Sequence, residues 1–150
     1  MMPAEVESGS MGRVAYARIG PNEDLVQGVC REPPAFCCLV KAGERKACVR
    51  EKARGFQYAA LVSRLSAEVG FESFVLKLAP GAQRRPVTTD GDEFLFMLKG
   101  RIEFMLGRRK INLAAGDAFY FDGRVAHVPV NRSGTEAELL VVCLLRNNNA

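Results

Sequence analysis

Short apolar runs separated by glycine fill the chain from residue 35 onward, and this pattern most limits the possible fold. Each run has the length and the apolar or aromatic content of a strand. In one of them Phe74, Leu76 and Leu78 alternate with other residues and so share one face. No long amphipathic helical pattern interrupts the series, which predicts an all-β barrel or sandwich. The predicted strands span residues 35–40, 56–62, 71–78, 93–98, 101–106, 110–113, 117–121, 126–130 and 138–145.

Glycines stand between most of these runs, where turns need the positive φ that glycine adopts at little cost. A hairpin is predicted from Arg101 to Leu113, with Gly107, Arg108 and Arg109 at its tip. The other predicted turn glycines are Gly70, Gly81, Gly100, Gly116, Gly123 and Gly134.

Residues 1–34 lack this strand pattern. We expect them to form a partly disordered N-terminal extension, followed by a barrel domain over residues 35–150. Within the extension, the segment from Pro21 is expected to open a short helix through Val29, which Pro33 and Pro34 would end. A single helix leaves no space for a helix-turn-helix domain beside the barrel.

Composition narrows the function classes. With 150 residues, 48% hydrophobic and 25% charged, the chain suits one globular domain with one core. A net charge of +4 is too small to indicate nucleic-acid binding by itself, so no direct contact with nucleic acid is expected. No secretory signal and no membrane span are visible, which predicts a cytoplasmic protein without a membrane partner.

The spacing of the cysteines does not match that of a disulfide framework. Their odd number and irregular spacing do not suit a secreted disulfide scaffold, so we expect reduced thiols. The close pairs typical of structural zinc sites are absent as well, and burial as small apolar residues is the simpler expectation. The five are Cys30, Cys37, Cys38, Cys48 and Cys143.

Two segments carry a more specific pattern. Residues 81–100 read GAQRRPVTTDGDEFLFMLKG, and residues 116–131 read GDAFYFDGRVAHVPVN. Together they resemble the paired motifs of the cupin superfamily, G-x5-H-x-H-x3-E-x6-G and G-x5-P-x-G-x2-H-x3-N. The framework positions in register are Gly81, Glu93, Gly100, Gly116, His127 and Asn131.

The resemblance implies a jelly-roll β-barrel with a short N-terminal extension. It extends upstream, because residues 41–62 look like the lead-in strands of cupin domains found in helix-turn-helix regulators. Cupins commonly dimerise, so a homodimer is expected, with residues 13–40 as the natural contact segment.

The metal-binding residues of the family are only half present. In such cupins two histidines and a glutamate of the first motif join the histidine of the second to hold Fe, Mn, Ni or Zn. Here Val87 and Thr89 stand at the two histidine positions, which leaves Glu93 and His127. His127 is the sole histidine, and two protein ligands are too few for tight binding. No cofactor is therefore expected; if one binds, it is a divalent transition metal at Glu93 and His127.

Glu93 and His127 have two interpretations. They could form an acid–imidazole pair at the bottom of a small-molecule pocket, with Thr89 and Tyr58 as further ligand-binding residues. They could equally be a paired relic without chemistry, since buried ionisable groups persist when paired or used. No catalytic residue can be assigned.

Other charged stretches have simpler explanations. Residues 90–93 read DGDE, which lacks the ligand spacing of an EF-hand and suits a turn that enters a strand. The basic clusters are interleaved with glutamates and are expected to be solvated surface. Arg84 and Arg85, near the expected barrel mouth, could steer an anionic ligand.

The leading hypothesis is a non-catalytic, sensor-like cupin that binds a small molecule and lacks the DNA-binding half of regulators. The alternative is a metal-dependent oxygenase, isomerase or lyase that uses Glu93, His127 and an unidentified third ligand. A metal-free acid–base enzyme and a purely structural barrel are the remaining options.

Overall fold

The computed structural model describes residues 29–30, 37–48, 53–68 and 70–146. Apart from one short 3-10 turn, the secondary structure of these residues is all β, as the sequence predicts. The elements are β1 (Val29–Cys30), β2 (Cys37–Cys38), η1 (Ala42–Glu44), β3 (Lys46–Cys48), β4 (Phe56–Leu65), β5 (Gly70–Leu78), β6 (Gly91–Lys99), β7 (Arg101–Leu106), β8 (Arg109–Ala114), β9 (Ala118–Asp122), β10 (His127–Val130) and β11 (Ala137–Leu145).

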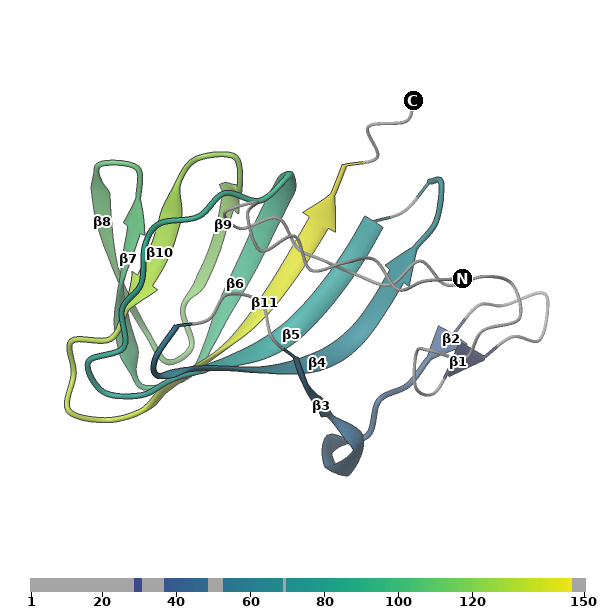
Figure 1. The fold of residues 1–150 in the computed structure, drawn as a ribbon, viewed down its shortest axis with the longest axis horizontal. Helices are drawn as coiled ribbons and strands as arrows, with labels where there is room; N and C mark the ends of the chain where they lie inside the picture. The colour runs from purple at the N-terminus through teal and green to yellow at the C-terminus, as the bar shows by residue number, and fades with distance from the viewer. Residues whose placement is uncertain (1–28, 31–36, 49–52, 69, 147–150) are drawn as a thin grey trace.

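Two antiparallel sheets make up the barrel. The larger has the strand order β3-β4-β5-β11-β6-β9 and the smaller the order β10-β7-β8. Figure 1 shows the smaller sheet at the left, facing β9, β6 and β11 of the larger one. β1 and β2 pair only with each other. This arrangement is the predicted jelly-roll barrel, and the strands missed by the sequence are β1 and β3.

Alternation along the strands places the core between the sheets. On β6 and β11 every second residue is buried and the residues between are half-buried or exposed. Burying one face of each strand against the opposite sheet is the main stabilising contribution in such a barrel. The buried core side chains include Phe56, Tyr58, Phe74, Leu76, Leu78, Leu95, Met97, Ile102, Phe104, Phe121, Leu139, Val141 and Cys143.

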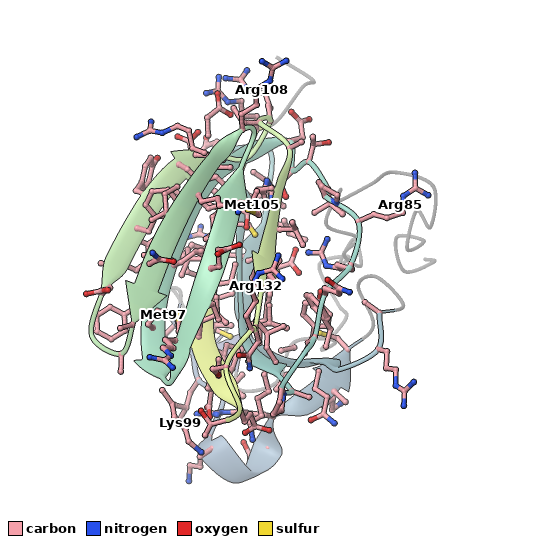
Figure 2. The ribbon with its side chains drawn as sticks, turned by 90° about the vertical axis from the view of Figure 1, so that its left-hand side faces the viewer. Arg85, Met97, Lys99, Met105, Arg108 and Arg132 are labelled. Carbon is pink, nitrogen blue, oxygen red and sulfur yellow. The ribbon has the colours of Figure 1, made fainter. Side chains whose placement is uncertain are left out.

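The predicted hairpin is present, with a tighter tip than expected. Leu106 pairs with Arg109, so only Gly107 and Arg108 form the turn and Arg109 already belongs to β8. Gly107 has φ of 57°, which suits glycine at the first central position of a two-residue hairpin. Figure 2 shows Arg108 at this end of the barrel, pointing away from it.

The prediction of positive φ is right for some of these glycines and wrong for others. Gly81, Gly100 and Gly116 have positive φ, as expected. The prediction of positive φ is wrong for Gly70, Gly123 and Gly134. Gly70 begins β5, where a side chain would meet Leu145, so close packing rather than backbone conformation favours glycine there.

Several expectations for the N-terminal part lie outside the described residues. The predicted helix over 21–29 is one of them, apart from Val29, which begins β1. Of the predicted strand 35–40, the structure shows Cys37–Cys38. No helix among the described residues is long and apolar enough to cross a membrane. The cytoplasmic location stays a prediction.

The expectation of five reduced thiols is wrong, because a disulfide consumes two of them. Cys37 is disulfide-bonded, whereas Cys38, Cys48 and Cys143 are not part of a disulfide. In the β1–β2 ladder Cys37 lies opposite Cys30. Sequence spacing alone could not reveal that register. Burial raises the pKa of the Cys38 thiol, which disfavours its reactive thiolate.

Candidate functional site

Glu93 and His127 meet inside the barrel although they come from different sheets. Glu93 lies on β6 of the larger sheet, and His127 begins β10 of the smaller one. The Nε2 atom of His127 lies 2.8 Å from Oε2 of Glu93, and the two side chains are 5% and 7% exposed. The two residues singled out in the sequence therefore form a buried pair that joins the sheets.

Hydrogen bonds limit this pair to two protonation arrangements. Nδ1 of His127 lies 2.8 Å from the backbone carbonyl oxygen of Val125, which can only accept, so Nδ1 carries a proton. On the other side of the ring, Nε2 lies close enough to the carboxyl group of Glu93 for one further proton to be held by either group. The pair is either imidazolium with carboxylate or neutral imidazole with carboxylic acid. Both arrangements are neutral overall, and they differ only by the movement of one proton.

Phenylalanine rings surround the imidazole. The ring of Phe104 stacks on that of His127 with centroids 6.0 Å apart, and Phe121 meets it edge-on at 4.8 Å. Phe119 completes the cluster, 5.5 Å from Phe104 and 5.4 Å from Phe121. These apolar neighbours lower the local dielectric, so the Glu93–His127 contact is stronger than it would be in water.

Val87 and Thr89 lie beside the pair, at the positions where the cupin pattern has histidines. The backbone of Val87 exchanges two hydrogen bonds with His127, of 2.9 and 2.8 Å. The amide of Thr89 donates to the carbonyl oxygen of Gly123 at 2.7 Å. Val87 and Thr89 are both buried. The segment that carries the first motif thus runs along the pair, as the resemblance implies.

Gly123 is closely surrounded by other residues of this site. A Cβ atom there would lie 2.6 Å from the carbonyl oxygen of Gly91, 3.0 Å from Cβ of Thr89 and 3.2 Å from Oε2 of Glu93. The residue is therefore glycine because of close approach. A side chain at this position would displace the carboxyl group or the Thr89 segment.

The donor set does not match the metal centre that the resemblance implies. Among the described residues, no group of three or more His, Cys, Asp or Glu side chains could hold a metal ion. Val87 offers no donor atom, and the donors of Glu93 and His127 face each other. A divalent transition metal needs three or more protein ligands for tight binding. The described residues therefore do not fit such a centre.

Tyr58 and Thr89 were the other predicted ligand-binding residues. Thr89 lies next to the pair through Gly123, as described. Tyr58 is buried on β4 and opposes Leu76, in the inward row that also holds Met97 of β6. Met97 is four residues from Glu93, so Tyr58 lies roughly 13 Å along the strands from the pair. Tyr58 packs its ring against Phe74 with a centroid distance of 5.4 Å.

Sequence reasoning did not connect two further residues with Glu93, although they lie in the same inward row. Glu72 of β5 pairs with Cys143 of β11, and Cys143 pairs with Glu93 of β6. Glu72 and Cys143 are buried. A signal was present, because Glu72 precedes Phe74 and Leu76 by even spacing and so shares their inward face.

The other charged residues considered in the sequence are Arg84, Arg85 and the DGDE stretch. The guanidinium of Arg84 stacks over the ring of Phe56 at 5.0 Å, so part of its charge is engaged. Figure 2 shows Arg85 pointing away from the barrel. In the DGDE stretch, Gly91 begins β6, which agrees with the prediction of a turn entering a strand.

The part of the chain that carries both motifs is similar to known proteins. A family model described as Cupin domain matches residues 74–143. The fold is that of a cupin. The match covers both motifs together with Glu93, His127 and Cys143, and it begins two residues after Glu72. No curated protein matches the sequence significantly.

Solved cupin-like structures are similar at low identity. The polyketide cyclase RemF from Streptomyces resistomycificus matches with a TM-score of 0.59 at 20% identity, over 71% of this chain and 78% of its own. The Cupin_2 domain of an XRE family transcriptional regulator from Enterobacter cloacae matches with 0.57 at 18%, over 62% and 99%. A predicted oxalate decarboxylase from Thermotoga maritima matches with 0.58 at 24%, over 72% and 99%. These likenesses establish the fold, and cupins with that fold have different functions.

Proposed function

We propose that this chain is a sensor-like cupin that binds a small polar molecule at the Glu93–His127 pair and does not catalyse a reaction. The observation that carries the proposal is the buried contact of 2.8 Å between His127 Nε2 and Glu93 Oε2, where related patterns have metal ligands. Burying two ionisable groups is costly unless they are paired or used. Both ring nitrogens of His127 are engaged, so the carboxyl group of Glu93 is the group that the pair offers to a polar ligand in an otherwise apolar setting.

One further observation supports binding without a metal, and a second supports the sensor-like role. The described residues do not provide the donors of a metal centre, as shown above. One of the similar structures is the Cupin_2 domain of a transcriptional regulator, so a domain of this fold occurs in a regulatory protein. The metal-dependent enzyme is the second candidate, and it requires a third ligand that the described residues do not place at the pair.

Thermal unfolding across a metabolite panel tests the proposal. A ligand that binds only the folded state raises Tm, by an amount that grows with its concentration. We expect at least one small polar compound to raise the Tm of the wild type and not that of Glu93→Gln. The matched control is Glu103→Gln, the same change on β7, where Glu103 pairs with Lys110 and Arg132 on the surface.

Other outcomes point to the other candidates. Compounds that raise the Tm of the wild type and Glu93→Gln equally bind elsewhere, which contradicts the proposal. Stoichiometric metal in untagged protein, lost in Glu93→Ala or His127→Ala, would identify the metal-dependent enzyme. A turnover that survives chelation and disappears in Glu93→Gln would identify a metal-free acid–base enzyme.

A further inference from the structure

The outward face of the smaller sheet carries a cluster of basic side chains. On β7, Arg101 and Glu103 alternate with buried core residues and therefore point outward. Lys110 of β8 lies opposite Met105, on the same outward side. Arg108 points away from the barrel at the hairpin tip. We call this surface the basic face; its charged residues are Arg85, Arg101, Glu103, Arg108, Arg109, Lys110 and Arg132.

Arg85 and Arg132 extend the basic face on the side of β10. The segment 82–87 runs beside β10, because backbone hydrogen bonds at both ends of the segment hold it to residues 127 and 131. Arg85 lies between these two contacts, and Arg132 follows soon after the end of β10. Figure 2 looks onto the basic face, with Arg108 at its top, Arg132 near its centre and Arg85 at its right-hand border.

The basic face holds an excess of positive charge. Its six basic residues oppose Glu103 on the face and Asp117, which borders it at the end of β8. The excess of four charges equals the net charge of the whole chain, so the remaining residues are neutral in total. Glu103 pairs with Arg132 at 3.2 Å and with Lys110 at 4.0 Å, yet these two partners are 63% and 64% exposed. The other four basic residues are exposed as well, so a partner can reach all six.

The chemistry of the basic face favours phosphate groups over apolar partners. Five of its six basic residues are arginine, whose planar guanidinium binds two phosphate oxygens at once. A protein interface has an apolar centre, membrane insertion needs apolar anchors, and single-stranded nucleic acid stacks on aromatic rings. The large apolar side chains that are exposed among the described residues lie outside β7, β8 and β10; they are Leu39, Leu98, Tyr120, Val125 and Leu144.

We propose that the basic face binds double-stranded DNA through its phosphates, without sequence preference. β7 is six residues long, so the face extends roughly 20 Å along the strands. Duplex DNA carries one phosphate charge per about 1.7 Å, or about twelve over that length, which is enough for every basic residue to meet one. Such contacts position a protein on the duplex and carry no sequence information.

This inference changes one expectation and leaves another untouched. The net charge of +4 averages the basic face with the rest of the chain, which is why it did not indicate contact with nucleic acid. The basic face lies outside the barrel, whereas the Glu93–His127 pair is buried inside it. DNA binding therefore does not depend on the proposed ligand site.

Fluorescence anisotropy with labelled duplex DNA tests the proposal on the full 150-residue chain. We expect two duplexes of unrelated sequence to bind equally well at low salt, because the contacts are made to phosphates. The logarithm of the association constant should fall linearly with that of the salt concentration, with a slope of about −4 to −5 for roughly five phosphate contacts. A wild type that does not bind duplex DNA at low salt would overturn the proposal.

Removing two charges tests whether the basic face makes the contact. Arg108→Gln with Lys110→Gln is expected to weaken binding by about tenfold or more at low salt and to reduce the slope by about 2. Arg45→Gln with Lys46→Gln is the matched control, because it removes the same two charges from exposed residues at β3, an edge strand of the larger sheet. We expect this control to change the affinity by no more than about twofold. Equal losses in both variants would show that binding follows net charge alone, which contradicts the proposal.

Glu103→Gln tests the proposal with the opposite sign. The change removes a carboxylate that repels phosphate and pairs with Lys110 and Arg132. We therefore expect duplex DNA to bind about threefold to tenfold more tightly, a gain that a damaged fold would not produce. Weaker binding by Glu103→Gln would contradict the proposal. So would tighter binding of the wild type to an RNA duplex of the same sequence or to vesicles of anionic lipid.

Discussion

Nε2 of His127 on the smaller sheet lies 2.8 Å from Oε2 of Glu93 on the larger sheet, and this contact links the two sheets of the barrel. Removing the imidazole leaves a buried carboxyl group without its partner. We expect His127→Ala to lower the free energy of unfolding by about 3–5 kcal/mol at neutral pH. Urea denaturation monitored by far-UV circular dichroism measures this change.

The matched variant keeps the contact in a neutral form. The side-chain amide of Gln in Glu93→Gln can donate to Nε2 while Nδ1 continues to donate to Val125. We therefore expect Glu93→Gln to cost about 1 kcal/mol, far less than His127→Ala. Equal losses in the two variants would show that the pair does not act as one unit.

Substitution at Gly123 probes how tightly the site is assembled. A Cβ atom there would lie 2.6 Å from the Gly91 carbonyl oxygen and 3.2 Å from the Glu93 carboxyl group. We expect Gly123→Ala to destabilise the fold by about 1–3 kcal/mol through overpacking. Gly134→Ala is the control, because nothing lies within 4 Å of its Cβ position, and a change within about 0.5 kcal/mol is expected.

Asn131 stabilises the fold rather than the site. It is fully buried, and its amide donates to the carbonyl oxygens of Leu78 at 3.0 Å and Thr135 at 2.8 Å. Its side-chain oxygen accepts from the backbone and hydroxyl of Ser133. We expect Asn131→Ala to cost about 3 kcal/mol and Ser133→Ala about 1 kcal/mol in urea denaturation. A smaller loss for Asn131→Ala would mean that the loop rearranges to satisfy these groups.

Asp122 is expected to make the fold sensitive to acid. The side chain and the backbone amide of Arg124 hydrogen-bond to this carboxylate and lower its pKa to about 2. A depressed carboxyl pKa contributes stability above the unfolded value, near 3.9, and that contribution is lost as pH falls toward 2. The urea midpoint should therefore fall less between about pH 4 and pH 2 in Asp122→Asn and in Arg124→Gln than in the wild type. An unchanged pH dependence in both variants would contradict this.

The sequence predicts much of the barrel because its signals are local. Alternation along a strand and glycine between strands are visible within ten residues, and they place β4 to β11 within a few residues of their observed ends. β3 was missed because three residues are too few to alternate. The hairpin tip was one residue too long, since pairing of Leu106 with Arg109 depends on the turn conformation.

The residues of the candidate site were likewise predictable only where a local pattern identifies them. Motif spacing identified Glu93 and His127, and the structure brings them together. Cys143 was interpreted only as core, and Glu72 was not considered. Both share a row with Glu93 because β11 inserts between β5 and β6. That strand order is a property of the whole chain, which no local pattern encodes. Gly123 lies in a turn as predicted but without positive φ, and its role comes from close contacts with Gly91 and Glu93.

The placement of residues 87 and 89 predicts that metal binding can be created by two substitutions. Val87 bonds to the His127 backbone and Thr89 to that of Gly123, so histidines there would lie beside Glu93 and His127. Four donors suffice for a divalent transition metal. We expect untagged Val87→His with Thr89→His to bind about one equivalent of nickel or manganese by elemental mass spectrometry.

Two controls make the result specific. Thr88→His adds a histidine on the exposed residue between these positions, and no gain in bound metal is expected from it. Adding Glu93→Gln to the double variant removes a ligand and should abolish the gain, because a neutral amide is a weak donor for these metals. Chelation should lower the Tm of the double variant and leave that of Thr88→His unchanged, since metal bound only to the folded state stabilises it. A folded double variant without metal would show that the histidine positions do not converge on the pair.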